Sequence, residues 1–246
     1  MGSNVRYERD GTVAVITLER PDRRNAIDRA TGDELLAAFE RLDADAAVDV
    51  GVVTGAGEDF CAGGDLDEIG ESGTLEGREQ GAMGFSHYEL DTPTIAAIEG
   101  HCVAGGLELA IYCDLRVAAN DATFGCFERR FGVPLVDGGT QRLPRIIGLG
   151  RALEMILTGR AVDAPEAYDW GLVNRLADSG EALAAAKLMA ETIADFPQKT
   201  VRTDRRAVYE GLGVPLDRGL AIESWWGTHA LETGREGARQ FSDEGA

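Results

Sequence analysis

The sequence predicts an α/β fold with a helical region at its C-terminal end. Short β-branched segments alternate with helical segments through the first part of the chain, as is typical of α/β architecture. After about Gly138 the strand signal fades and helical spacing dominates. The length of 246 residues, 44% of them hydrophobic and 27% charged, suits one such domain with a small appendage. We therefore expect an α/β core over residues 1–195 and a helical region over residues 196–246.

Short apolar runs and one amphipathic pattern predict the elements of the first half. Residues 31–42 place four large apolar side chains on one face, which indicates a helix. A second helix begins at residues 65–69, and a longer one is expected over residues 75–90. Runs bounded by turn residues predict strands at residues 12–19, 48–54, 94–99 and 114–119.

The second half is predicted to be a series of helices. They are expected at residues 140–157, 164–170, 180–195, 198–210, 216–231 and 233–242, with a short strand near residues 172–175. Trp225 and Trp226 are neighbours in this part, and adjacent residues on a helix point about 100° apart. Either one tryptophan faces another subunit or the helix has a wide apolar face.

Composition and charge exclude several classes of protein. The net charge of −19 argues against nucleic acid as a partner, because phosphate binding needs a basic surface. No apolar run is long enough to span a bilayer, and the first ten residues lack an apolar signal core. We therefore expect a cytoplasmic protein that binds no membrane. The four cysteines lack metal or redox spacing, which favours reduced buried thiols and no metal site.

Three glycine-rich loops stand out, at residues 55–66, 100–109 and 131–143. Each contains a Gly-Gly pair followed by helix-forming residues, and the first two follow neighbouring predicted strands. A glycine pair lets the backbone approach a ligand, and the first turn of a helix adds free N–H donors and a favourable dipole. Tight turns would explain one such pair, but the recurrence favours two convergent sets of N–H groups.

The motifs of common nucleotide and hydrolase sites are absent from the sequence. No first strand leads into G-x-G-x-x-G, and neither G-x-x-x-x-G-K-[ST] nor G-x-S-x-G occurs. Convergent N–H groups without an obvious nucleophile suggest an oxyanion hole, which polarises a carbonyl and holds an enolate. Carboxylates must then supply the acid/base chemistry.

Glu108 and Glu128 are the candidate acid/base groups. Glu108 lies in the apolar stretch GHCVAGGLELAIYC, one turn past the Gly-Gly pair. Carboxylates are rarely buried in such surroundings without a partner or a function. Glu128 lies in FGCFERRFG, where a surface ion pair with one of the two following arginines is the alternative role.

Several motifs together resemble the enoyl-CoA hydratase/isomerase family, also called the crotonases. The most specific are FCAGGDLDEI (residues 60–69), GHCVAGGLELAIYCDLRVAA (residues 100–119) and GVPLVDGGTQRLPRIIGLGRALEMILTGR (residues 132–160). Residues 21–28, 161–176 and 232–241 extend the resemblance over nearly the whole chain. The set is specific for the family and far less specific for the reaction.

The resemblance implies a fold, an assembly and a substrate. The fold would be a crotonase-like spiral of ββα units with a C-terminal helical trimerisation region, and the assembly a homotrimer or homohexamer. The substrate would be an acyl-CoA thioester, which carries its own coenzyme A, so no separate cofactor is implied. The pocket for this substrate would be lined by Arg24, Ala26, Ala62, Asp65 and Leu66, with Arg24 facing phosphate.

The resemblance also implies catalytic roles. The N–H groups of Gly64 and Gly105 match the oxyanion donors of the family, and Glu108 and Glu128 match the two glutamates that hold water in the hydratases. Glu108 would orient and deprotonate water, and Glu128 would exchange the proton at the α-carbon. A glutamate in an apolar cleft should have a raised pKa, as an acid/base group near neutrality needs. These roles imply an enoyl-CoA hydratase, which adds water reversibly and syn to a 2-enoyl-CoA.

Two alternatives stay open. Another crotonase reaction is one, such as that of a Δ3,Δ2-enoyl-CoA isomerase or a specialised acyl-CoA dehydratase or hydrolase. An isomerase needs only one base, so the presence of both glutamates favours hydration. A non-catalytic binding protein on this fold, including an RNA-binding relative, is the other. The net charge of −19 disfavours RNA.

Some positions depart from the family pattern. Asp67 stands where many hydratases have a lysine near the adenine of coenzyme A. Arg129 follows Glu128 and would lower its pKa on contact. Asp137 stands where a small residue is common, as either an extra acid/base group or a loop cap. His87 lies within residues 70–92, which would shape the acyl pocket, and a surface position is the commoner case for such a histidine.

Overall fold

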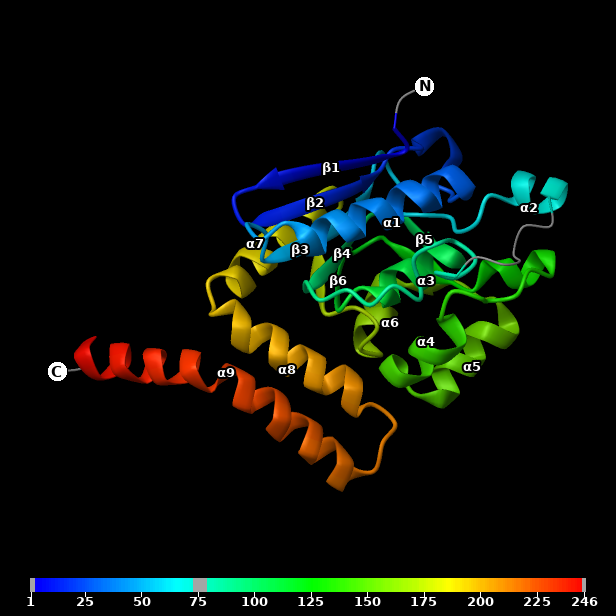
Figure 1. The fold of residues 1–246 in the computed structure, drawn as a ribbon. Coiled ribbons are helices and arrows are strands. Elements are labelled where there is room, and N and C mark those ends of the chain that lie inside the picture. The colour runs from blue at the N-terminus through cyan, green and yellow to red at the C-terminus, as the bar shows by residue number, and fades with distance from the viewer. Residues whose placement is uncertain (1–2, 73–78, 245–246) are drawn as a thin grey trace.

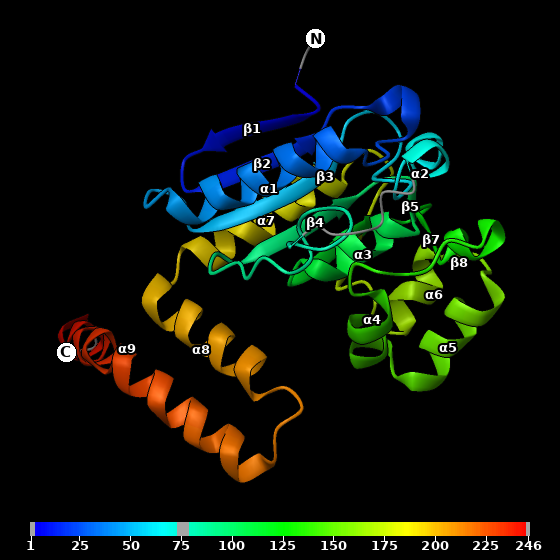
Figure 2. The same cartoon turned by 45° about the vertical axis from the view of Figure 1, so that its right-hand side comes forward.

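The computed structural model describes residues 3–72 and 79–244. Its large sheet has the strand order β1–β2–β3–β4–β6–β9, of which β1 to β4 can be followed in Figures 1 and 2. β1 and β2 form an antiparallel hairpin, and the other neighbouring pairs are parallel. These strands are β1 (Val5–Asp10), β2 (Val13–Leu18), β3 (Val50–Gly55), β4 (Thr94–Ile98), β6 (Leu115–Ala119) and β9 (Arg175–Ala177).

A small second sheet lies next to the glycine-rich loops. It contains β5 (His101–Val103), β7 (Thr123–Gly125) and β8 (Val162–Asp163) in that order. An isolated parallel bridge between Cys61 and Cys102 connects the first loop to β5. The chain thus runs from β4 of the large sheet directly into the small sheet, which brings the second loop beside the first.

The two faces of the large sheet are covered by different helices. Alternate residues of a strand point to opposite faces. Val13 and Val15 of β2 pack in the core that contains α7, whereas Ala14 and Ile16 pack in the core that contains α1 and α3. The helices of this part are α1 (Arg29–Ala44), α2 (Leu66–Ser72), α3 (Gly105–Tyr112), α4 (Gly139–Ile147), α5 (Leu149–Thr158), α6 (Ala164–Asp169) and α7 (Ala182–Ala194).

The last two helices, α8 (Gln198–Gly211) and α9 (Leu216–Glu244), pack against each other and extend away from the large sheet (Figures 1 and 2). Arg205 of α8 donates to the Asp114 carboxylate at 2.8 Å, and the same carboxylate accepts from Thr94 N–H at 2.8 Å. One carboxylate therefore joins α8 to the starts of β4 and β6. Exposed large hydrophobic side chains of the hairpin are Val208, Tyr209, Leu212, Val214, Leu216, Leu220, Trp225, Leu231 and Phe241.

The mixed α/β fold class and most predicted elements are confirmed. The four predicted strands correspond to β2, β3, β4 and β6, and the predicted helix over residues 31–42 corresponds to α1. Helices are present where they were expected after Gly138, with two differences in their division. The helix expected over residues 140–157 is two helices, α4 and α5, separated at Gly148, and residues 216–231 and 233–242 belong to the single helix α9. The strand expected near residues 172–175 lies slightly later, at β9.

The helix expected over residues 75–90 is wrong where the structure describes it. Residues 79–93 form turns and irregular backbone, and residues 73–78 lie outside the described ranges. Gly81 and Gly84 have φ of +94° and +86°, in the left-handed region that interrupts a helix. β1, β5, β7 and β8 were not predicted. Three of them have only two or three residues, too few for a period to show.

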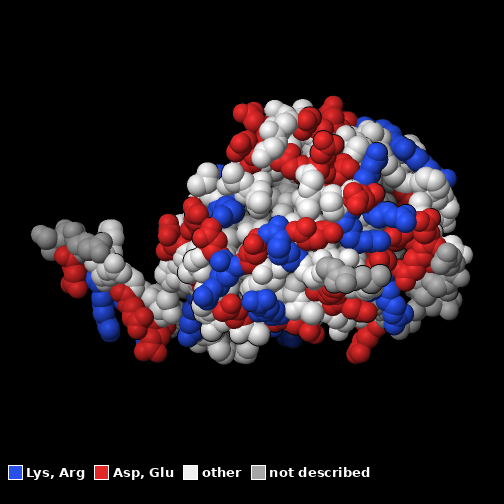
Figure 3. Space-filling model, turned by 90° about the horizontal axis from the view of Figure 1, so that it is seen from above, with Lys and Arg blue, Asp and Glu red and all other residues white. Residues whose placement is uncertain are grey.

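The structure also describes the cysteines, the surface charges and the candidates for membrane or metal contacts. All four cysteines are buried and unpaired. Acidic and basic side chains are interspersed over the face shown in Figure 3. Across the described ranges, no helix combines the length and the apolar character that crossing a membrane requires. The same residues hold no group of three or more His, Cys, Asp or Glu arranged to bind a metal ion.

Candidate active site

The first two glycine-rich loops lie side by side because their backbones are hydrogen-bonded. Phe60 N–H donates to Glu99 O at 2.8 Å, and Cys61 N–H donates to His101 O at 3.0 Å. Val103 N–H donates back to Cys61 O at 3.1 Å. The first loop thus runs as a short extension of the small sheet, which places its Gly-Gly pair next to the second pair.

The glycines allow an approach that no side chain would permit. A Cβ on Gly106 would lie 2.1 Å from the carbonyl oxygen of Cys61, and a Cβ on Gly63 would lie 2.6 Å from the nitrogen of Gly105. Contacts below 3.0 Å with backbone atoms force the backbone to move. One glycine of each pair, Gly63 and Gly106, is therefore required for the two loops to meet.

The residue before α3 has a strained backbone. Ala104 has φ 52° and ψ −128°, a region that L-residues seldom occupy, and its N–H donates to Gly125 O at 2.8 Å. This conformation starts α3 at Gly105. Within the described part of the chain, the N–H groups of Gly64 and Gly105 donate to no other group. The two loops thus present two free donors close together.

A cavity of about 220 Å³ lies beside these donors. It takes in Gly64 and Gly105, both candidate glutamates, and Ala62 and Leu66 of the predicted substrate pocket. The rest of its described lining is mainly apolar and comprises Ile69, Met83, Val103, Ala104, Phe127, Phe131, Val133, Pro134, Val136 and Asp137. Such a cavity suits an apolar group attached to a polar carbonyl.

Glu108 is held at this cavity by the third glycine-rich loop. Its side chain is buried, with the residue 3% exposed, and Oε1 accepts from Asp137 N–H at 2.9 Å and from Gly139 N–H at 2.7 Å. Burial, the largest cause, raises the pKa of Glu108 to about 7 against the effect of the Gly139 N–H. The charges of Asp137 and Glu128 raise it further. Glu108 therefore titrates near neutrality.

Glu128 lies on the 3-10 helix Phe127–Phe131 and is also buried, at 5% exposed. Neither carboxylate oxygen has a hydrogen-bond partner among the described residues. Burial raises the pKa of Glu128, and Arg129 opposes this shift only partly. The surface ion pair considered for Glu128 is wrong, because Arg129 donates to Ile156 O and Arg130 donates to Gly159 O.

The residues predicted to bind coenzyme A come from two segments that are joined by backbone hydrogen bonds. Ala62 N–H donates to Arg24 O at 2.9 Å, and Asp65 N–H donates to Ile27 O at 3.0 Å. This pairing brings the segment with Arg24 and Ala26 beside the segment with Ala62, Asp65 and Leu66, and Ala62 and Leu66 line the cavity. Arg24, Ala26 and Asp65 do not line the cavity itself.

Two positions that depart from the family pattern have structural roles. Asp67 forms an ion pair with Arg23 at 2.6 Å, which neutralises one cation near Arg24. Asp137 is a loop cap, because its carboxylate accepts from Ser86 Oγ at 2.7 Å and from a backbone N–H. His87 is exposed and does not line the cavity.

Sequence reasoning missed four residues that shape the site. Met83 and Ile69 line the cavity next to Gly105 and Gly64, respectively. Asn25 is fully buried, and its amide donates to Ala56 O at 2.9 Å and to Asp59 O at 2.7 Å. Arg20 pairs with the Asp65 carboxylate at 2.9 Å. All four lie in segments with a sequence signal, although none was singled out: Arg20 begins the RPDRRNAID turn that contains Asn25, Ile69 ends FCAGGDLDEI, and Met83 lies within residues 70–92.

Comparison with known proteins agrees with this geometry. The model of the enoyl-CoA hydratase/isomerase family matches residues 8–245. A short-chain-enoyl-CoA hydratase of Clostridium acetobutylicum is 38% identical over 90% of this chain and 87% of its own length. A crotonyl-CoA hydratase of Syntrophomonas wolfei is 36% identical over 90% of this chain and 87% of its own length.

A solved structure of an enoyl-CoA hydratase has a similar fold. The crystal structure of an enoyl-CoA hydratase from Mycobacterium tuberculosis superposes with a TM-score of 0.92 at 37% identity, over 99% of this chain and 97% of that one. The fold and site define an α/β protein in which two free backbone N–H donors lie beside a cavity with two buried glutamates. The chain belongs to the enoyl-CoA hydratase/isomerase family.

Proposed function

We propose that this protein is an enoyl-CoA hydratase that adds water reversibly and syn to the C2=C3 bond of a 2-enoyl-CoA. The observation that carries the proposal is the pair of buried glutamates, Glu108 and Glu128, in one cavity with two free backbone donors. A pair of carboxylates on one face of a double bond can take one proton from water and give another to carbon. The names of the similar hydratases support the same reaction.

The thioester carbonyl oxygen would accept from the N–H groups of Gly64 and Gly105. These donors would stabilise the oxygen as it gains negative charge, and one such donor typically contributes about 10²–10³ in rate. Ile69 packs against Gly64 and Met83 against Gly105, which keeps bulk water away from both donors. Low local polarity strengthens hydrogen bonds to a developing charge.

The proton transfers would be divided between the two glutamates. Ionised Glu108 takes a proton from water as the hydroxyl oxygen bonds to C3. The C2=C3 electron pair moves toward the carbonyl, and protonated Glu128 then delivers its proton to C2. The C2=C3 electron pair ends in the new C2–H bond, so the reaction involves no net oxidation or reduction and needs no redox cofactor. The two backbone donors to Oε1 of Glu108 hold its other oxygen toward the cavity.

The remaining assignments concern binding and assembly. Exposed Arg24 would face the phosphates of coenzyme A beside Ala26, Ala62, Asp65 and Leu66. The α8–α9 hairpin, within residues 196–246, would mediate a homotrimer or homohexamer through its exposed apolar side chains. Four buried free thiols fit a reducing compartment, so we place the protein in the cytoplasm.

The test follows the loss of conjugated thioester absorbance when the protein is mixed with crotonyl-CoA. We expect rapid loss with the wild type and a rate lower by roughly 10²–10⁴ in Glu128→Gln, which keeps the shape but cannot donate the proton. Glu181→Gln, at an exposed position on α7's N-terminal side, is the matched control and should match the wild type. A folded wild type that leaves crotonyl-CoA unchanged but moves the double bond of a 3-enoyl-CoA would establish an isomerase instead.

A further inference from the structure

The loop over residues 81–87 forms one wall of the cavity and is tied down by Asp137. Asp137 is 0% exposed, and its carboxylate accepts from Ser86 Oγ at 2.7 Å and from Met83 N–H at 3.1 Å. Gly81 closes the same turn, since a Cβ there would lie 2.6 Å from Asp137 Oδ1. The loop is therefore wrapped around one buried carboxylate that is more than 50 residues away in the sequence.

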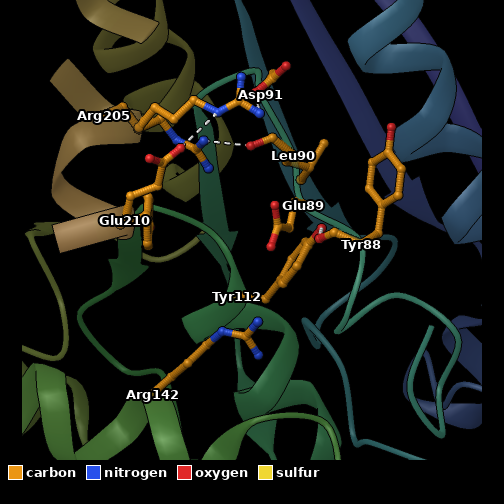
Figure 4. Close-up of a pocket in the computed structure, with 10 residues that line it drawn as sticks. Tyr88, Glu89, Leu90, Asp91, Tyr112, Arg142, Arg205 and Glu210 are labelled. Atoms are coloured by element: carbon orange, nitrogen blue, oxygen red, sulfur yellow. Dashed lines mark hydrogen bonds and ion pairs between the residues drawn. The ribbon is translucent and has the colours of Figure 1, made fainter. Parts of the chain in front are cut away.

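Arg142 of α4 holds the same two segments from another side. One guanidinium nitrogen donates to Asp137 O at 3.1 Å and another donates to Ser86 O at 2.8 Å. The guanidinium also lies over the Tyr112 ring, 5.3 Å from its centroid. Figure 4 shows Arg142 and Tyr112 at a second cavity, between residues 88–91 and α8. The loop over residues 81–87 is thus also held by Arg142, on the side away from the active-site cavity.

Met83 is the part of this loop that reaches the oxyanion donors. A Cβ placed on Gly105 would lie 2.5 Å from both Sδ and Cε of Met83, so the thioether packs directly on that glycine. Met83 is 7% exposed and lines the cavity. An acyl group whose carbonyl lies at Gly105 would therefore meet the Met83 side chain.

The same residue that holds Met83 also holds Glu108. Asp137 N–H donates to Glu108 Oε1 at 2.9 Å, while the Asp137 carboxylate binds Met83 N–H. Glu108, Asp137, Met83 and Gly105 thus form a closed ring of contacts around the cavity. The position of the wall and the position of the acid/base group are linked through one residue.

We propose that Asp137 is a positioning residue that holds Met83 across the cavity, and that Met83 thereby restricts the substrate to short acyl chains. This inference rests on the proposed function, because it takes the cavity to be the acyl site. The cavity volume of about 220 Å³ agrees with a short chain. Pockets for larger ligands occupy about 300–1,000 Å³.

Isothermal titration with butyryl-CoA and octanoyl-CoA tests the inference without turnover, because these saturated thioesters have no double bond to hydrate. The variants are Met83→Ala, Asp137→Ala and Asp137→Asn. Met189→Ala is the matched control, since Met189 is also 7% exposed but packs between α7 and the large sheet. The measured quantity is the ratio of the two dissociation constants.

We expect the wild type to prefer butyryl-CoA and Met83→Ala to shift the ratio toward octanoyl-CoA by roughly tenfold or more, as pocket methylenes typically do. Asp137→Ala should shift it in the same direction. Asp137→Asn should retain the wild-type ratio, because its amide can still bond Met83 N–H and Ser86 Oγ. Met189→Ala should retain it as well. If Asp137→Ala does not fold, Ser86→Ala, which removes one of the two ties, replaces it and should shift the ratio less.

An unchanged ratio in Met83→Ala, or a wild type that binds octanoyl-CoA as tightly as butyryl-CoA, would overturn the inference. Hydration of crotonyl-CoA by the wild type is measured in parallel and reports on the proposed function separately. Selective binding without hydration would refute the hydratase and leave the inference standing. Hydration without chain-length selectivity would refute the inference and support the hydratase. Binding of neither thioester, together with no hydration, would refute both.

Discussion

Glu108→Gln should make the protein more stable and less active, and the stability gain should depend on pH. Burial raises the pKa of Glu108 from 4.5 to about 7, so ionising it costs more in the folded than in the unfolded state. Below pH 4.5 the carboxyl is protonated in both states and the cost vanishes. As pH rises toward 7 only the unfolded state ionises, and the folded state loses stability.

The magnitude follows from the size of the pKa shift. Each pKa unit corresponds to about 1.4 kcal/mol, so the move from 4.5 to about 7 destabilises the native state by about 3 kcal/mol at pH 8. The same relation gives less than about 1 kcal/mol at pH 5. Glutamine is neutral at both pH values, and its Oε1 can still accept from Asp137 N–H and Gly139 N–H.

Urea unfolding at pH 5 and pH 8, at one protein concentration, measures the difference. We expect Glu108→Gln to gain about 3 kcal/mol at pH 8, or roughly 6–12 °C in Tm, and little at pH 5. Glu181→Gln should show no such dependence, because that side chain is exposed. A gain of equal size at both pH values, or none at pH 8, would refute the reasoning that the buried charge is the cause.

Four further outcomes are expected. The kcat/KM for hydration should rise with pH through about 7 as Glu108 ionises, measured as a pH profile with crotonyl-CoA. Gly106→Ala should lower the free energy of unfolding, measured in urea, by about 1–3 kcal/mol, because its Cβ would lie 2.1 Å from Cys61 O. A stable, active variant would contradict this contact. Arg24→Ala should raise KM roughly tenfold with kcat unchanged, an effect that shrinks in high salt. Trp225→Glu, at a side chain 55% exposed on α9, should yield monomers in sedimentation if the hairpin mediates assembly.

The sequence predicted the buried parts of the fold well because they have a regular pattern. β3 and β4 are continuous apolar runs covered on both faces, and α1 has one clear apolar stripe. The expected helix over residues 75–90 failed because apolar spacing there coincides with glycines in left-handed conformation. β5 and β7 are short strands held by pairing with segments distant in the sequence, which no local pattern records.

The sequence also predicted which residues gather at the cavity, through the glycine pairs and the two glutamates. It left open whether Glu128 lies at the surface, because burial of that carboxylate depends on where Arg129 and Arg130 point. The link from Asp137 to Met83 was out of reach for the same reason. It joins two irregular loops far apart in the chain, and loop conformation is set by tertiary contacts rather than by periodicity.

The carboxylate of Asp114 has a consequence for how copies of the chain meet. By binding Thr94 N–H in the sheet and Arg205 in α8, it fixes the direction in which the α8–α9 hairpin leaves the core. Two partners that must order a loose segment on association lose conformational entropy at that moment. A hairpin already held by this ion pair and by the bonds from Arg202 to Thr92 and Val48 O avoids that part of the cost of association. If the hairpin mediates assembly as proposed, part of the geometry of that assembly is set within a single subunit, by contacts such as Asp114–Arg205 between residues 91 positions apart in the chain.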